Sequence, residues 1–136
     1  MKKFFVAFMA VLVLAGCGAQ KEEKKTASEV MMMTVETVNS TTEMLEKAET
    51  ADEVVEAMSV MVNEMKELQN KYGDVLAEIQ EMNEEEMLEK YADEVAAVEE
   101  AATRFYEVLV VKEQEIEMTP EAQEKMMQVL QSASEL

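Results

Sequence analysis

The feature that most constrains this fold is a row of apolar residues that recur at alternating spacings of four and three. The row comprises Val54, Met58, Met61, Met65, Leu68, Tyr72, Val75, Ile79 and Met82. Such spacing places all of these side chains along one side of an α-helix, as in a coiled coil. Thr50 precedes the row, and Glu53 follows three residues later, which is the pattern of a capping box. The sequence predicts one helix over residues 51–82 or, as the alternative, a break at Gly73.

A second apolar row has a different phase, which predicts that the chain reverses near Asn83. This row comprises Tyr91, Val95, Val98, Ala102, Phe105 and Leu109. Asn83 is a favourable N-cap, and acidic residues follow it where the helix dipole favours them. A helix is therefore expected over residues 84–118. Thr119-Pro120 then supplies an N-cap and a first helical residue, which predicts a last helix over residues 120–134.

The first helix is expected over residues 28–48 and is the weakest of the four. Its middle, "TVNSTTEM", is rich in Thr, Ser and Asn, which favour helix poorly, so a kink or fraying is expected near Asn39-Ser40. The rest of the chain favours helix, with no Trp and one Pro among 136 residues. Five acid-first i,i+4 ion pairs support the same reading. These pairs are Glu43–Lys47, Glu67–Lys71, Glu86–Lys90, Glu100–Arg104 and Glu121–Lys125.

These helices predict an all-α fold in the form of an elongated antiparallel bundle. The helices over residues 51–82 and 84–118 are expected to form a long two-helix coiled-coil hairpin. The shorter first and last helices would pack at the base of this hairpin, which leaves residues 72–95 as an exposed two-helix spike. In this arrangement Phe105 lies opposite Met61 or Val62.

The N-terminus carries a different signal. Met1-Lys2-Lys3 is positively charged, and an apolar run of about 12 residues follows, which is too short to span a bilayer. The run ends in Leu14-Ala15-Gly16-Cys17, and Cys17 is the one cysteine in the chain. This segment resembles the lipobox of bacterial lipoproteins.

The resemblance implies that a diacylglyceryl group is attached to the Cys17 thiol and that the chain is cut between Gly16 and Cys17. Residues 1–16 would then be a signal peptide, 17–27 a flexible tether and 28–136 one helical domain. Because two or three acyl chains anchor firmly, the mature protein is expected to be tethered to a membrane. Gly18 stands where Asp signals inner-membrane retention in the Gram-negative pattern, which implies the outer membrane. In a Gram-positive organism the protein would lie on the outer face of the cell membrane.

The charge of the chain limits its partners. The formal net charge is −18, and loss of Lys2 and Lys3 with the signal peptide would bring it to −20. A nucleic-acid backbone would be repelled, so no nucleic-acid binding is expected. Anionic headgroups would be repelled too, so the helical domain is expected to stand away from the membrane surface.

The residue types argue against catalysis. The chain has no His, which removes the commonest general base and metal ligand, and it has no Gly-rich phosphate loop. No enzyme activity, catalytic residue, cofactor or metal site is therefore expected. Clusters of acidic residues, such as those at 84–86, are interpreted as solvated helix faces.

Methionine is unusually frequent, with 14 residues in the chain. Met31, Met32 and Met33 cannot all face one core, because three successive residues cover about 200° of a helix. We therefore predict a partner surface that includes these three residues and the acidic residues at 84–86, which are Glu84, Glu85 and Glu86.

Met58, Met61 and Met65 could instead bind Cu(I), a soft ion, although core packing explains methionine at these positions. The expected function is a lipid-anchored envelope protein whose helical domain acts as a non-catalytic interaction or structural module. Its partner is expected to be another envelope protein. The alternative is a small envelope metal-binding protein that uses Met thioethers or clustered carboxylates.

Overall fold

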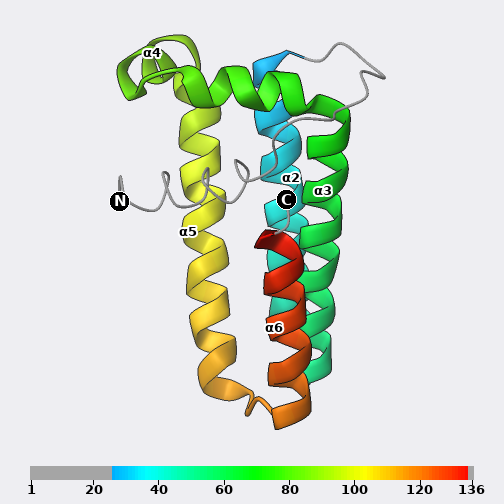
Figure 1. The fold of residues 1–136 in the computed structure, drawn as a ribbon. Helices are drawn as coiled ribbons and strands as arrows, with labels where there is room; N and C mark the ends of the chain where they lie inside the picture. Colours follow the sequence, from blue (N-terminus) through cyan, green and yellow to red (C-terminus); the bar gives the residue numbers. More distant parts are fainter. Residues whose placement is uncertain (1–25, 135–136) are drawn as a thin grey trace.

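The computed structural model describes residues 26–134, which form an all-α helical bundle, as the sequence predicts (Figure 1). Within this range there are five helices and no strand. The helices are α2 (Ala27–Lys47), α3 (Ala51–Glu81), α4 (Glu84–Lys90), α5 (Ala92–Glu115) and α6 (Pro120–Ser134). Side-chain caps begin most of them. Thr50 and Glu53 form the predicted capping box of α3, and Thr26 and Glu29 form a second box at α2.

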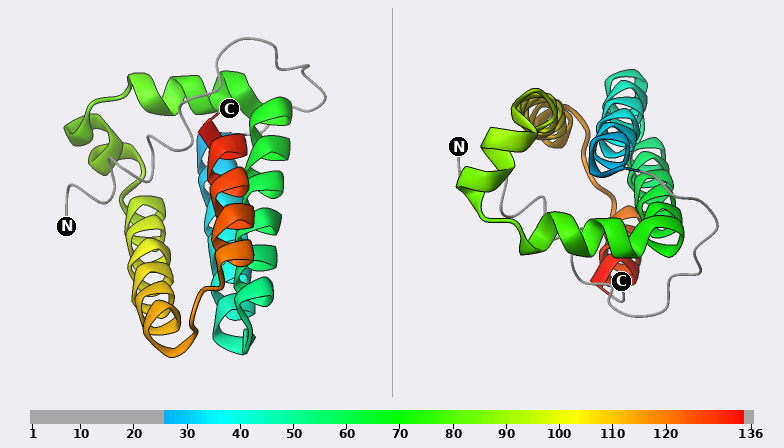
Figure 2. Two further views of the ribbon diagram at one scale, coloured as in Figure 1. Left: turned by 60° about the horizontal axis from the view of Figure 1, so that its bottom comes forward. Right: turned by 90° about the horizontal axis from the view of Figure 1, so that it is seen from above.

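Helix α2 is the centre of the bundle. It packs against both α3 and α5 and stands between them when the molecule is viewed along its axis (Figure 2). Val30, Val38 and Leu45 are fully buried there. The predicted kink near Asn39-Ser40 does not occur, because α2 is one uninterrupted helix.

Buried threonines make this central position tolerable for α2. The hydroxyl groups of Thr34, Thr41 and Thr42 each donate a hydrogen bond to the carbonyl group four residues earlier, at 2.8–3.1 Å. A buried polar group that has such a partner avoids most of its desolvation cost. The threonines, which favour helix poorly, therefore do not prevent α2 from being buried between other helices.

The predicted helix over residues 51–82 is bent. Tyr72 has non-helical backbone angles (φ −128°, ψ 27°), one residue before the alternative break at Gly73. After this bend, residues 73–81 run across the end of the bundle and lead into α4 (Figures 1 and 2). We call residues 73–90 the crosspiece.

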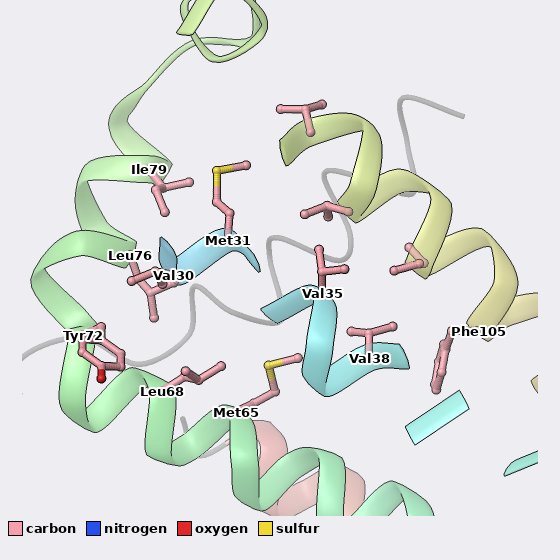
Figure 3. Packing of buried hydrophobic residues seen from close by; sticks show 14 of the residues in the cluster. Val30, Met31, Val35, Val38, Met65, Leu68, Tyr72, Leu76, Ile79 and Phe105 are labelled. Carbon is pink, nitrogen blue, oxygen red and sulfur yellow. The ribbon is translucent and has the colours of Figure 1, made fainter. Parts of the chain in front are cut away.

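The crosspiece replaces the predicted spike, which does not exist. Ile79 is 1 % exposed and Leu76 is also buried. Figure 3 shows both side chains beside Val30 and Met31, in the first turns of α2. The prediction of an exposed spike was wrong because these turns of α2 present apolar side chains that must be covered, and the bent chain covers them.

The predicted coiled-coil hairpin is also replaced. The helix expected over residues 84–118 is divided at Tyr91 (φ −134°, ψ 39°) into α4 and α5, and it ends at Glu115. Helices α3 and α5 share few direct contacts, because α2 lies between them. Phe105 is buried in the main core, as predicted, whereas Val62 lines a pocket between α3 and α6. Short connections favour antiparallel neighbours, but here the crosspiece separates the two long helices.

Helix α6 is attached to the outside of the bundle. It packs against α3 through a small second cluster that is centred on Ala51, Val55 and Ala122. The side chain of Thr119 caps α6 by accepting a hydrogen bond from the backbone N–H of Ala122, at 3.2 Å. This arrangement gives α6 a single helical neighbour among the described residues, and it gives α2 two.

Candidate interaction surface

The three consecutive methionines are divided between the core and the surface. Met31 is 3 % exposed, Met32 is 41 % exposed and Met33 is half-buried. The prediction that the three could not all face one core is confirmed. Met32 lies on the side of α2 that faces away from α3 and α5, together with the exposed residues Glu36 and Glu43.

The acidic residues Glu84, Glu85 and Glu86 form the first turn of α4. The side chain of Asn83 accepts a hydrogen bond from the backbone N–H of Glu86, at 2.8 Å. The Glu86 carboxylate lies 2.8 Å from the Lys90 ammonium group and raises the pKa of Lys90. Because α4 packs against α5 and shares few contacts with α2, the acidic turn and Met32 belong to different parts of the same end of the molecule.

Polar contacts hold α5 against α2 at both ends. The Arg104 guanidinium group lies 2.9 Å from both carboxylate oxygens of Glu46. Near the other end, the Ser28 hydroxyl group donates a hydrogen bond to Glu94, and this bond lowers the pKa of Glu94. The Lys112 ammonium group donates a hydrogen bond to the Ala48 carbonyl group, at 3.0 Å. Sequence spacing assigned Arg104 to Glu100, whereas the structure pairs it with Glu46 on another helix.

Most of the large apolar side chains that are exposed among the described residues lie on the last two helices. They are Val110 and Val111 near the end of α5 and Met127 and Leu130 on α6. Met127 is 67 % exposed and Leu130 is 53 % exposed. Sequence reasoning missed this surface. The signal was available in Val108-Leu109-Val110-Val111, because four successive apolar residues cannot all face the core of an amphipathic helix.

A pocket of about 650 Å³ lies along the seam between α3 and α6. Its lining includes the apolar residues Val55 and Val129 and the charged residues Asp52, Glu56 and Lys125. Lys125 lies 3.3 Å from both Asp52 and Glu121, and these carboxylates raise its pKa. Lys125 in the pocket wall is therefore already paired with two carboxylates of the chain.

The methionines considered for copper binding lie in the apolar core. Met58 and Met65 are buried in the main cluster, and Met61 packs against it. The same cluster contains Leu68, which lies beside Met65 in Figure 3, and Phe105, and these are residues of an ordinary helical core. Between residues 26 and 134, no group of three or more Asp or Glu side chains has the geometry to hold a metal ion.

The predicted lipidation and cleavage residues, Gly16 and Cys17, lie outside the described residues, as does most of the predicted tether. Within residues 26–134, none of the helices combines the length and the apolar character that are needed to cross a bilayer. Comparison of the whole chain with protein-family models, with curated proteins and with solved structures gives no match.

Proposed function

We propose that this chain is a lipid-anchored protein of the bacterial envelope whose helical domain acts as a non-catalytic module for binding another envelope protein. The observation that carries the proposal is the segment Leu14-Ala15-Gly16-Cys17, after two lysines and a short apolar run. This segment resembles the signal by which bacterial lipoproteins receive an acyl anchor on cysteine. The lone cysteine is then the site of lipidation and needs no disulfide partner.

The helical domain supports a role in protein binding. Four of the exposed large apolar side chains among the described residues lie on α5 and α6, and the other two lie on α2 and α4. An apolar group on an otherwise charged surface is typical of an interaction site. The strong negative charge keeps the domain away from anionic headgroups and leaves that surface accessible to a protein.

The proposal is tested by replacing the predicted lipidation residue. Cys17→Ser is expected to abolish acylation, because a hydroxyl group does not replace the thiolate as the lipid acceptor. The variant should keep residues 1–16, since the lipoprotein peptidase acts on lipidated precursors. Mass spectrometry of the purified proteins measures both changes, and Gly18→Ala is the matched control that should be processed normally. A wild-type chain that carries no lipid would refute the proposal.

A further inference from the structure

Helix α6 has too few neighbouring helices to cover all of its apolar side chains. Among the described helices it packs against α3 alone, and it shares few contacts with α5 although the two are consecutive. Ala122 is its one buried residue, and Met126 and Val129 are partly buried against the core clusters, whereas Met127 and Leu130 are exposed. One flank of α6 therefore presents apolar side chains that no helix of the described chain covers.

The unpaired flank can be located from helical geometry. Lys125, Gln128 and Ser132 line the pocket against α3. At 100° per residue, Met127 and Leu130 lie on the opposite flank of α6 from these pocket residues, and the contact with α3 lies between the two flanks. They are three residues apart and so adjoin each other on the helix surface. Together they form an apolar stripe, which we call the α6 stripe.

Carboxylates flank the exposed apolar residues of α5 and α6. Glu107 precedes Val110 by three residues, and Glu124 precedes Met127 by three, so each lies beside its apolar neighbour on the helix surface. Further exposed carboxylates at this end of the molecule are Glu113, Glu115, Glu117 and Glu121.

The two lysines at this end already have acidic partners. Lys112 contacts Glu115 and the Ala48 carbonyl group, and Lys125 contacts Asp52 and Glu121. The cations of α5 and α6 nearest the apolar residues are thus committed to contacts within the chain. On the surface of α6 itself, Glu124 is the charged residue that adjoins the α6 stripe, and the other carboxylates lie at the connection between α5 and α6.

We infer that the α6 stripe binds a basic amphipathic helix of a partner protein, which identifies the partner chemistry of the proposed function and rests on it. The apolar side of such a helix would cover Met127 and Leu130, and its Lys and Arg side chains would meet Glu124 and the carboxylates at the connection between α5 and α6. A second copy of this chain fits poorly, because each copy carries a net charge of −18 and like charges oppose association. The bound helix supplies the second helical neighbour that α6 lacks.

The probe is a synthetic peptide of about 18 residues, or roughly five helical turns, with Leu at i, i+3, i+4 and i+7 and Lys elsewhere. A control peptide has the same composition in an order that has no apolar face. The full-length protein is carried in discs of uncharged phosphatidylcholine, with empty discs as the blank, and binding is measured by fluorescence anisotropy. The amphipathic peptide is expected to bind at least about tenfold more tightly than its control.

Matched variants locate the binding site on the protein. Met127→Ser with Leu130→Ser is expected to weaken binding of the amphipathic peptide at least about tenfold, because it removes both apolar anchors. Met32→Ser with Leu88→Ser is the control, since these exposed apolar residues lie on other helices, α2 and α4. The control should change binding less than about twofold. Far-UV circular dichroism checks that both variants remain folded.

Equal binding of the amphipathic peptide by the wild type and the Met127/Leu130 variant would refute the inference. Equal binding of the two peptides by the wild type would also refute it, because it would indicate charge attraction alone. Light scattering that shows a dimer, and a monomer for the variant, would assign the stripe to a second copy and also refute it. Normal lipidation of Cys17 without peptide binding would overturn this inference and leave the proposed function standing. Peptide binding by a chain that is never lipidated would overturn the proposed function and leave the binding of a basic helix standing.

Discussion

Helices α2 and α6 differ in how much of each is buried by neighbouring helices. In α2, ten residues are buried, and four of these are threonines. In α6, a single residue is buried although the helix carries two methionines, a valine and a leucine. Residue type therefore does not decide burial in this molecule. The number of helices that pack around each segment decides it, and the predictions below test that difference.

The largest effect is expected for Phe105→Ala, which removes the one phenylalanine among the described residues from the core around α2. The loss of a buried aromatic ring should lower the free energy of unfolding by about 3–5 kcal/mol. Chemical denaturation followed by circular dichroism measures this change. A loss below about 1 kcal/mol would show that the core around α2 is loosely packed.

A matched pair compares the two regions directly. Leu45 on α2 is fully buried and Leu130 on α6 is 53 % exposed. Leu45→Ala should cost about 2–5 kcal/mol, whereas Leu130→Ala should change the free energy of unfolding by less than about 0.5 kcal/mol. Similar losses at the two sites would mean that α6 is covered in solution, for instance by another chain, and the comparison would fail.

The caps of α3 and α6 provide a smaller contrast. Thr50 and Thr119 each accept a hydrogen bond from a backbone N–H three residues later. Thr50→Ala should cost about 1 kcal/mol of global stability, because α3 is part of the main core. Thr119→Ala should instead increase amide hydrogen exchange within α6 and leave α2 protected, since α6 can open locally. Increased exchange throughout the bundle would show that α6 unfolds together with α2.

The smallest effect concerns pH. Backbone N–H groups of Glu49 and Thr50 donate hydrogen bonds to the Glu53 carboxylate and lower its pKa below 4.5, and the Ser28 hydroxyl group lowers that of Glu94. A lowered pKa stabilises the fold above the unfolded pKa, and this stabilisation is lost as the pH falls through the folded pKa. Between pH 7 and about 4.5, protonation relieves the excess negative charge, so the melting temperature should rise.

Below that range the melting temperature should fall as Glu53 and Glu94 become protonated. Glu94→Gln is expected to reduce this acidic decline, and Glu29→Gln, at another cap, serves as the control for removal of one charge. Thermal melts by circular dichroism at pH 3 to pH 7 measure both effects. A melting temperature that falls steadily from pH 7 downwards would contradict the prediction.

Local signals in the sequence predicted local structure well. The capping box at Thr50, the cap at Asn83 and the start of α6 at Pro120 all occur where the residues indicated. Each depends on groups within four residues of one another, so the chain needs no knowledge of distant neighbours to form them.

The arrangement of the helices could not be predicted in the same way. The apolar spacing continues through Tyr72 to Val75 and Ile79 without interruption, because the crosspiece also has an apolar side that must be buried. Only the partner changes, from a second long helix to the first turns of α2, and periodicity does not identify a partner. The threonines of α2 misled for a related reason, since their low helix propensity is outweighed by burial between two neighbours.

The candidate surface was predicted only in part. Met32 is exposed, in agreement with the prediction that Met31, Met32 and Met33 could not all face one core, but the exposed residues of α5 and α6 were not predicted. The apolar residues of α6 are spaced as in any amphipathic helix, and such spacing does not reveal that a neighbouring helix is missing. Three-dimensional packing was needed to find the α6 stripe.

The position of α2 also determines how the domain responds to mechanical force. Residue 26 leads directly into the helix that α3 and α5 enclose, so tension on the N-terminal segment acts along the axis of α2. Extraction of α2 requires its contacts with both neighbours to slide together along its length, and the Glu46–Arg104 pair must break in the same event. Tension on the C-terminal end would instead peel α6 from α3 one turn at a time. Under tension between its two ends, the described part of the chain is therefore expected to lose α6 from α3 before α2 is extracted from the bundle.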